Sequence, residues 1–349
     1  MAATILNDRE ITERGGYVIR ASADGSITWV SEHLPLVVPM SAQVGNGTIW
    51  VSSIVDDDAR PGQRSIRVAR VSLVGDVLGL VEAPIDARTS TVIEVTSMAV
   101  LEDRALVAVR SNSELMLPDT MLTASGYVLT MFGSGGYESG WPSIGRVQVL
   151  ETADGEICGV VGVDDRTELS CGLQSEETRY TLAELAPGSE GDQVVIHDLD
   201  FEGASSFTGY GGELTGGDWR GCVVFEIAAG SPTRTVCPDV TGISAARAPG
   251  GGHYLASESR ERGIDGFNYA VWRLTEVDGD FVPIWQHRTD GSLGTTPTGM
   301  ALSPSGVLAV GLEYIGDSEL GEISFEGPPY AGVGYPNHGS AILFYSIPR

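Results

Sequence analysis

The amino-acid sequence predicts an all-β protein built from one repeated antiparallel unit. Its 46 glycines separate short apolar segments, which is how turn residues divide one strand from the next. Apolar and polar residues alternate within these segments, for example in residues 48–51, 67–71, 127–131 and 222–227, as in strands with one buried face. Amphipathic helical periodicity is nearly absent, since the best helical candidate, residues 181–185, is one turn long.

The segments recur in a fixed order. A strand of small residues, a tight turn and a second apolar strand occur together in residues 40–51, 97–109, 147–161, 198–210, 243–256 and 299–310. The turns are about 52 residues apart, and a repeat of this length with four strands per unit is typical of β-propeller blades. Small residues suit the first strand because innermost strands crowd around a central axis. The sequence therefore predicts a single β-propeller domain over residues 1–349.

Strands from both termini are expected to close the ring. Residues 340–345 have the character of the third strand of the last blade, and residues 26–30 supply its outer fourth strand. Residues 17–19 would form an extra edge strand. Six blades are favoured and seven is the alternative, because about 90 residues separate the last turn from the first and no seventh inner strand is visible among them.

At the level of the fold, the chain resembles secreted bacterial β-propellers. The segment Ser22-Ala23-Asp24-Gly25-Ser26-Ile27-Thr28-Trp29 resembles the Asp-box of sialidase-like propellers, which lies on the turn between the third and fourth strands. It lacks one residue between Asp24 and Gly25, and it occurs once. The Asp-box is a turn motif without a catalytic role, so the resemblance implies the fold and no activity.

Charge excludes several classes of partner. The formal net charge is −26, and a nucleic-acid backbone or an anionic membrane surface would be repelled by it. No run of eighteen apolar residues is present, so no membrane insertion is expected. All 21 basic residues are arginine, which excludes lysine Schiff-base chemistry and a P-loop lysine.

The four cysteines fall into two close pairs, Cys158 with Cys171 and Cys222 with Cys237. Neither spacing matches a zinc knuckle or a CxxC redox motif, and each pair flanks a hairpin-like stretch. Two local disulfides are predicted, with four reduced core thiols as the alternative. Disulfides would imply the periplasm, the cell surface or the medium. The residues after Met1 lack the features of a signal peptide, so export would require that the signal was removed beforehand.

Carboxylates and a histidine are the candidates for chemistry. Asp56, Asp57 and Asp58 are adjacent and offer hard oxygen ligands to Ca²⁺, although a solvated acidic loop is favoured because the D-x-D-x-D-G alternation of calcium loops is absent. His197, Asp198 and Asp200 open the fourth inner strand. Alternation along a strand places the two aspartates on one face, where they could act as acid and base or hold a metal; the alternative is an inner strand that binds channel water. No other cofactor is implied.

Aromatic residues in glycine-rich segments are the candidate ligand contacts. Three long loops are expected, and their aromatic side chains offer planar surfaces for a sugar or a protein. These side chains are Tyr137, Trp141, Tyr210, Trp219, Tyr330 and Tyr335. Packing against neighbouring blades is the alternative explanation for them.

Two functions follow from this pattern. The first is an exported propeller that binds a protein or glycan partner through aromatic loops. The second is a propeller hydrolase or lyase that uses His197, Asp198 and Asp200, with or without a divalent cation. The fold alone does not decide between them, because propellers carry both kinds of function.

Overall fold

The computed structural model describes most of the chain. The described residues are 4–6, 9–11, 16–22, 26–36, 41–56, 63–87, 90–143, 145–153, 155–163, 166–172, 183–186, 193–203, 206–215, 218–228, 231–236, 242–248, 250–262, 268–280, 282–288, 295–303, 306–315, 318–320, 323–325 and 338–346. For residues 183–236 the description covers the backbone only. Within these ranges all regular structure is β, and no helix of membrane-spanning length and apolarity occurs.

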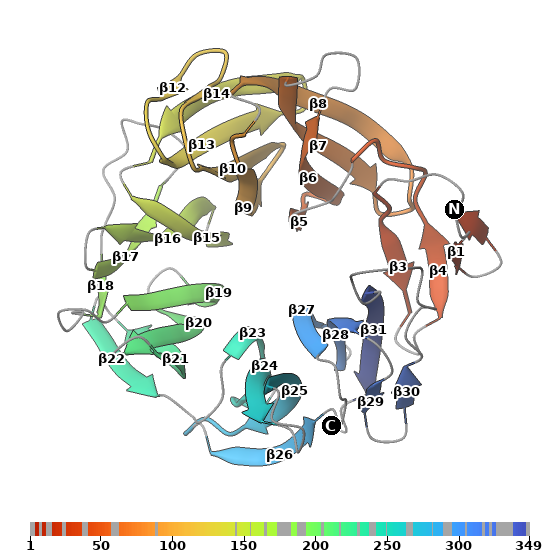
Figure 1. Cartoon of the computed structure of the whole chain (residues 1–349), viewed down its shortest axis with the longest axis vertical. Helices are drawn as coiled ribbons and strands as arrows, with labels where there is room; N and C mark the ends of the chain where they lie inside the picture. Colours follow the sequence, from red (N-terminus) through yellow and green to blue (C-terminus); the bar gives the residue numbers. More distant parts are fainter. Residues whose placement is uncertain are drawn as a thin grey trace. The chain divides into compact units, whose positions relative to one another are not determined.

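The chain divides into two compact units. The first comprises Met1–Ser22 and Ser26–Pro187, and the second comprises Ala23–Gly25 and Gly188–Arg349. Both consist of antiparallel sheets in which most neighbouring strands are consecutive in the sequence (Figure 1).

The first unit holds three large sheets and two short hairpins. The first sheet has the order β12-β11-β8-β7-β6-β5 and contains β5 (Ser41–Gly45), β6 (Thr48–Asp56), β7 (Gln63–Ser72), β8 (Val77–Asp86), β11 (Leu115–Met116) and β12 (Met121–Leu122). The second contains β9 (Ile93–Leu101), β10 (Arg104–Ser111), β13 (Gly126–Gly133) and β14 (Gly136–Pro142). The third contains β15 (Arg146–Ala153), β16 (Glu156–Val163), β17 (Arg166–Cys171) and β18 (Ala183–Ala186). The hairpins are β1 (Thr4–Leu6) with β2 (Arg9–Ile11), and β3 (Ile19–Ala21) with β4 (Ile27–Val30).

The second unit repeats this plan. One sheet contains β19 (Gln193–Gly203), β20 (Ser206–Thr215), β21 (Asp218–Ala228) and β22 (Ser231–Val236). The next contains β23 (Gly242–Arg247), β24 (His253–Arg262), β25 (Asn268–Val277) and β26 (Pro283–Arg288). The last contains β27 (Thr295–Leu302), β28 (Val307–Ile315) and β31 (His338–Ser346), and β29 (Ser318–Leu320) pairs with β30 (Ile323–Phe325).

The hairpins predicted from the repeat are confirmed. They are β5–β6, β9–β10, β15–β16, β19–β20, β23–β24 and β27–β28, and in each the first strand is the edge strand of its sheet. Within the first unit β9 lies beside both β5 and β15, and within the second unit β23 lies beside both β19 and β27. First strands of consecutive sheets thus gather together, as expected for innermost strands of propeller blades.

Local sequence explains why the turns are tight. Asn46 and Gly47 both have positive φ, as the hairpin between β5 and β6 requires of its two central residues. In the turn from β7 to β8, Gly75 adopts a φ of 100°. The Ser72 hydroxyl there accepts hydrogen bonds from the backbone N–H groups of Val74 and Asp76. Side-chain capping and left-handed glycine therefore fix the return of the chain.

The hydrophobic cores lie between successive sheets. Trp50 and Ile66 of the first sheet pack in one cluster with Met98 and Phe132 of the second. The other face of the second sheet packs against the third through a separate cluster that includes Leu106 and Ile157. The second sheet is therefore apolar on both faces, which fits the small and branched residues of its strands.

The hairpin of β3 and β4 and the segment after it dock on the first sheet. Leu34 and Leu36 are fully buried against Val51 and Ala69 of that sheet. The strand predicted over residues 26–30 is confirmed as β4, and residues 340–345 lie within β31, the third strand of its sheet. In the described residues β4 pairs with β3, and the predicted pairing of residues 26–30 with the C-terminal sheet is not among the ladders.

Candidate functional site

Polar side chains meet where the inner strands of the first unit converge. The Gln43 side chain on β5 donates a hydrogen bond from Nε2 to Oε1 of Glu151 on β15, at 3.4 Å. This bond joins the first sheet to the third, across the inner strand of the second. Gly45 on β5 lies directly against the side chain of Val100 on β9, so only glycine permits this close approach. The inner strands thus bring an amide and a carboxylate together.

A β-bulge recurs in the inner strands. In five of the described ladders, one residue in the first half of the inner strand has no partner in the neighbouring strand of the hairpin. These residues are Thr96, Gln148, His197, Ile243 and Thr298. Bulges bend a strand and redirect its side chains. The sequence does not reveal this feature, because a bulge leaves no mark in apolar and polar alternation over so short a strand.

The predicted catalytic residues lie on β19, for which the backbone is described. Asp198 is directly opposite Tyr210 and Asp200 is opposite Thr208. His197 is the bulge residue of the strand, so the strict alternation expected for it does not hold. Asp200 lies three residues after the bulge residue His197 in β19. Glu151 likewise lies three residues after the bulge residue Gln148 in β15. The two aspartates therefore stay in one regular ladder, and His197 does not.

The prediction of a long loop around Tyr137 and Trp141 is wrong. Residues 133–136 form the tight turn of a hairpin, and both aromatic residues lie in β14. Trp141 is only 7% exposed and packs in the cluster between the second and third sheets. Gly136 adopts a φ of 142°, which lets the chain turn back at once. Glycines that suggested an open loop instead permit a sharp turn.

Tyr137 is held by a partner within the first unit. Its hydroxyl donates a hydrogen bond to Oδ1 of Asp119, while Oδ2 of Asp119 accepts the backbone N–H of Gly140 at 3.2 Å. Burial, together with Asp119, raises the pKa of Tyr137 well above its usual range. The ring packs edge-on against Phe132 with centroids 5.7 Å apart. This tyrosine therefore fastens the loop before β12 to the second sheet.

Replacing Tyr137 by phenylalanine should lower the free energy of unfolding by about 1 kcal/mol, because Asp119 loses its hydroxyl donor. Denaturant unfolding measures the change. Tyr127→Phe is the matched control, because the Tyr127 hydroxyl makes no hydrogen bond among the described residues. This substitution should change the free energy of unfolding little. Equal effects of the two substitutions would contradict the role assigned to Asp119.

The remaining aromatic candidates stay predictions. Tyr210 lies in β20, and Trp219 lies in β21 opposite Leu214; both are described by backbone alone. Tyr330 and Tyr335 fall outside the described residues.

The predicted calcium ligands are described in part. Asp56 ends β6, and its Oδ1 accepts the Nε–H of Arg64 at 2.8 Å, so a cation there would compete with a guanidinium. Asp57 and Asp58 fall outside the described residues. The described residues contain no group of three or more histidine, cysteine, aspartate or glutamate side chains placed to hold a metal ion.

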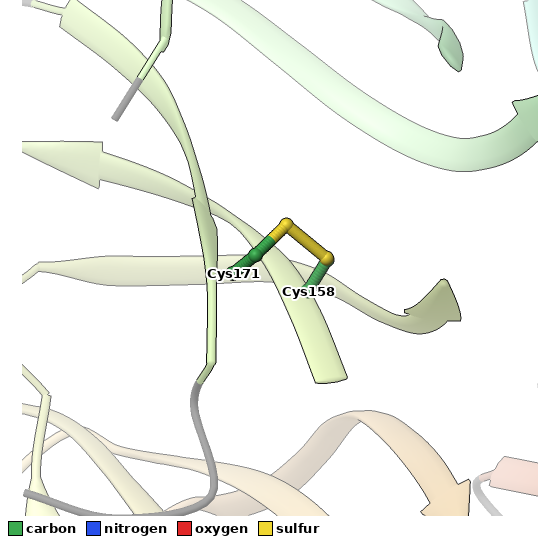
Figure 2. The surroundings of a disulfide bond; sticks show 2 residues. All are labelled: Cys158 and Cys171. Atoms are coloured by element: carbon green, nitrogen blue, oxygen red, sulfur yellow. A yellow bond between two sulfur atoms is a disulfide. The ribbon is translucent and has the colours of Figure 1, made fainter. Parts of the chain in front are cut away.

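One predicted disulfide is present. Cys158 on β16 and Cys171 on β17 face each other in the ladder and are joined by a disulfide (Figure 2). It closes a loop across the third sheet. Cys222 lies in β21, described by backbone alone, and Cys237 falls outside the described residues. The second pairing therefore remains a prediction.

Exposed apolar side chains gather along the outer strand of the first sheet. We name Leu73, Val74, Leu78 and Leu80 the β8 patch; they lie in the β7–β8 turn and on β8. Val74 is 69% exposed, Leu78 50% and Leu80 41%. On its outer side β8 pairs with β11 at Asp86 alone. Along the rest of this side, no strand pairs with β8 in the described part of the chain, and natural proteins usually protect an edge of this kind. Alternation does not reveal this patch, because the strand also carries apolar residues on its buried face.

Aromatic side chains of two sheets contact one another in the second unit. The ring centroid of Trp285 on β26 lies 5.0 Å from that of His287 and 6.3 Å from that of Tyr254 on β24. His287 also approaches Tyr345 of β31 at 6.1 Å. Burial raises the pKa of Tyr345 to about 12. These contacts join two sheets of the second unit, so their structural role is packing.

His253 is a buried base in the same unit. It begins β24 with 6% exposure, and burial, followed by the charge of Arg247, lowers its pKa from 6.5 to about 4. Protonation therefore favours the unfolded chain. The contribution of neutral His253 to stability is complete above about pH 6.5 and is lost as the pH falls toward 4. His253→Gln should flatten this part of the profile, measured by denaturant unfolding at successive pH values. Parallel profiles for the two proteins would contradict the assignment.

Comparison with known proteins supports the fold. No protein-family model matches the sequence, and curated proteins give no match. A putative 6-phosphogluconolactonase from Bacteroides fragilis is similar in structure, with a TM-score of 0.54 at 12% identity, over 95% of this chain and 94% of that one. The fold is β-propeller-like. At this identity the likeness shows the propeller fold alone.

Two further structures are more distant. Dihydro-heme d1 dehydrogenase NirN has a TM-score of 0.46 at 12% identity, over 99% of this chain and 76% of that one. Apocarotenoid oxygenase from Synechocystis also has a TM-score of 0.46, at 11% identity, over 84% of this chain and 72% of that one.

Proposed function

We propose that the protein is an exported six-bladed β-propeller that binds a partner protein. The observation that carries this proposal is the β8 patch, where apolar side chains are exposed beside an open strand edge. An extended segment of a partner could pair with that edge and cover Leu78 and Leu80. Covering exposed apolar surface is favourable, and a patch of this kind marks interaction sites on soluble proteins.

The blade count belongs to the same proposal. The repeated hairpins provide six inner strands, and the C-terminal sheet has β27, β28 and β31, one strand short of the other repeats. The hairpin of β3 and β4 docks on the first sheet, through Trp29 Nε1 donating to the Leu73 carbonyl at 3.1 Å. In a closed propeller the last blade adjoins the first. The docking of β4 therefore supports its assignment to the last blade.

Export is supported by the disulfide between Cys158 and Cys171, because disulfides persist in oxidising compartments. We place the protein in the periplasm, at the cell surface or in the medium, with Cys222 and Cys237 as a second pair. Intact mass without reductant should be lower than the reduced mass by about four hydrogens for two disulfides. A difference of two hydrogens would indicate that Cys222 and Cys237 are reduced.

Site-specific photo-crosslinking in the native cells tests the binding proposal. A photoreactive amino acid in place of Leu80 should give one saturable protein adduct, identifiable by mass spectrometry. The same amino acid in place of Val44, which is 66% exposed on the opposite edge of the same sheet, is the control and should not. Introducing Leu78→Asp should abolish the adduct at position 80. No adduct, or equal adducts at both positions, would refute the proposal.

Saturable binding on a glycan array in place of the adduct would favour a glycan ligand. The proposed contacts for such a ligand are Tyr210, Trp219, Tyr330 and Tyr335.

The register of β19 favours a second candidate, a propeller hydrolase or lyase. Asp198 lies opposite Tyr210, which places an acid and a phenol at neighbouring positions of the ladder. His197 at the bulge, with Asp198 and Asp200, would be its acid–base residues, and Ca²⁺ at Asp56, Asp57 and Asp58 would be structural. Turnover in a panel of glycosides, esters and lactones, lost in Asp198→Asn and Asp200→Asn, would support this alternative. A melting temperature that EDTA leaves unchanged would exclude a structural calcium ion.

A further inference from the structure

Among the described residues, one arginine of the first sheet, Arg70, has no carboxylate partner. Trp50, Arg70 and Gly79 are directly opposite one another on β6, β7 and β8. The Arg70 guanidinium carbon lies 5.5 Å from the centroid of the Trp50 ring. In contrast, Arg64 and Arg67 on the same strand pair with Asp56 and Glu82. In a chain of net charge −26, an arginine that has no acidic partner in the described residues is unexpected.

Two buried donors at this place lack an acceptor among the described residues. Trp50 is 1% exposed, and within that part of the chain its indole Nε1–H has no hydrogen-bond partner; the same holds for the buried Nε–H of Arg70. A buried donor without an acceptor is costly, and native proteins rarely keep one. Both donors belong to stacked side chains.

Glycine keeps the guanidinium open. A Cβ at Gly79 would lie 3.3 Å from Nη2 of Arg70, so any side chain there would cover the charged group from the side of β8. Gly79 lies on β8, which at this position has no paired strand on its other side among the described residues, and Arg70 itself is partly exposed. A small ligand group can therefore approach the guanidinium across Gly79, while Trp50 supplies the buried wall.

We propose that Arg70 and Trp50 bind one carboxylate group. The planar guanidinium matches a carboxylate in two parallel hydrogen bonds, and stacking on the indole holds its plane. A singly charged group fits better than a phosphate dianion, because burial penalises charge and the net negative charge of the chain repels a dianion more strongly. The carboxylate belongs either to a small organic acid or to the C-terminus of a peptide.

The Trp50 indole N–H resonance in a ¹⁵N–¹H spectrum reports directly on this site. Sodium formate should shift it saturably when it replaces sodium chloride at constant ionic strength. Trp50→Phe assigns the resonance by its loss. Arg70→Gln should abolish the shift and Gly79→Val should weaken it, whereas Arg67→Gln, on the paired arginine of the same strand, should leave it unchanged. Arg70→Lys, which keeps the charge without the planar group, should weaken binding at least several-fold.

Two further probes separate the sources of the carboxylate. N-acetylglycine binding more tightly than acetate, with no binding of N-acetylglycinamide, would indicate a peptide C-terminus. Equal binding of acetate and N-acetylglycine would indicate a small acid. A shift that does not saturate, or that persists in Arg70→Gln with an unchanged fold by circular dichroism, would mean an adventitious ion only and overturn the proposal. The photo-crosslinking result at Leu80 does not depend on this outcome.

Discussion

Replacing Phe132 by alanine is expected to lower the free energy of unfolding by about 3–5 kcal/mol, because it removes a large side chain from a closely packed interior. Phe132 lies on β13, is fully buried, and packs in the cluster that joins the first and second sheets. It also supports the Tyr137 ring, which approaches it edge-on. Loss of Phe132 therefore weakens the contact between sheets as well as the anchoring of the loop that Asp119 belongs to.

Guanidinium-induced unfolding measures this effect. Phe132→Leu should lose much less stability, because it retains most of the buried volume. Val44→Ala is the surface control on β5, where a change within about 0.5 kcal/mol is expected. A Phe132→Ala protein as stable as the Val44→Ala protein would show that the two sheets do not share this core.

Removing the disulfide in the double variant Cys158→Ala and Cys171→Ala is expected to cost about 3 kcal/mol, the loop-closure value for a loop of about this length. The two cysteines are 13 residues apart and link β16 to β17. The crosslink restricts the unfolded chain, so its loss mainly stabilises the unfolded state. The third sheet should be affected first, since both strands belong to it.

Unfolding with and without dithiothreitol measures this contribution. The wild-type protein should be destabilised by the reductant to at least the level of the double variant. The double variant itself is the control, because any further response to reductant must come from Cys222 and Cys237. A double variant as stable as the oxidised wild type would contradict a stabilising role for this disulfide.

Much of the fold could be predicted from the sequence because its determinants are local. Each inner hairpin combines small residues, a turn and an apolar strand, and the Asn46–Gly47 turn has the backbone geometry that these two residues favour. The spacing of Cys158 and Cys171 likewise follows from one hairpin. Features that depend on neighbours within a few residues can therefore be predicted from short stretches of sequence.

The site was less predictable because it depends on register and on contacts distant in the sequence. The bulge at His197 becomes apparent only when β19 is aligned with β20. The glycines before Trp141 suit an open loop and a tight turn equally, and burial of the tryptophan between two sheets decides between them. The pairing of Trp50 with Arg70 depends on the alignment of β6 with β7, which alternation alone does not fix.

An experimental structure of the whole chain tests the central claim most directly. The proposal predicts six sheets around one axis with their first strands innermost. A structure in which the sheets form an open array instead of a closed ring would contradict the propeller.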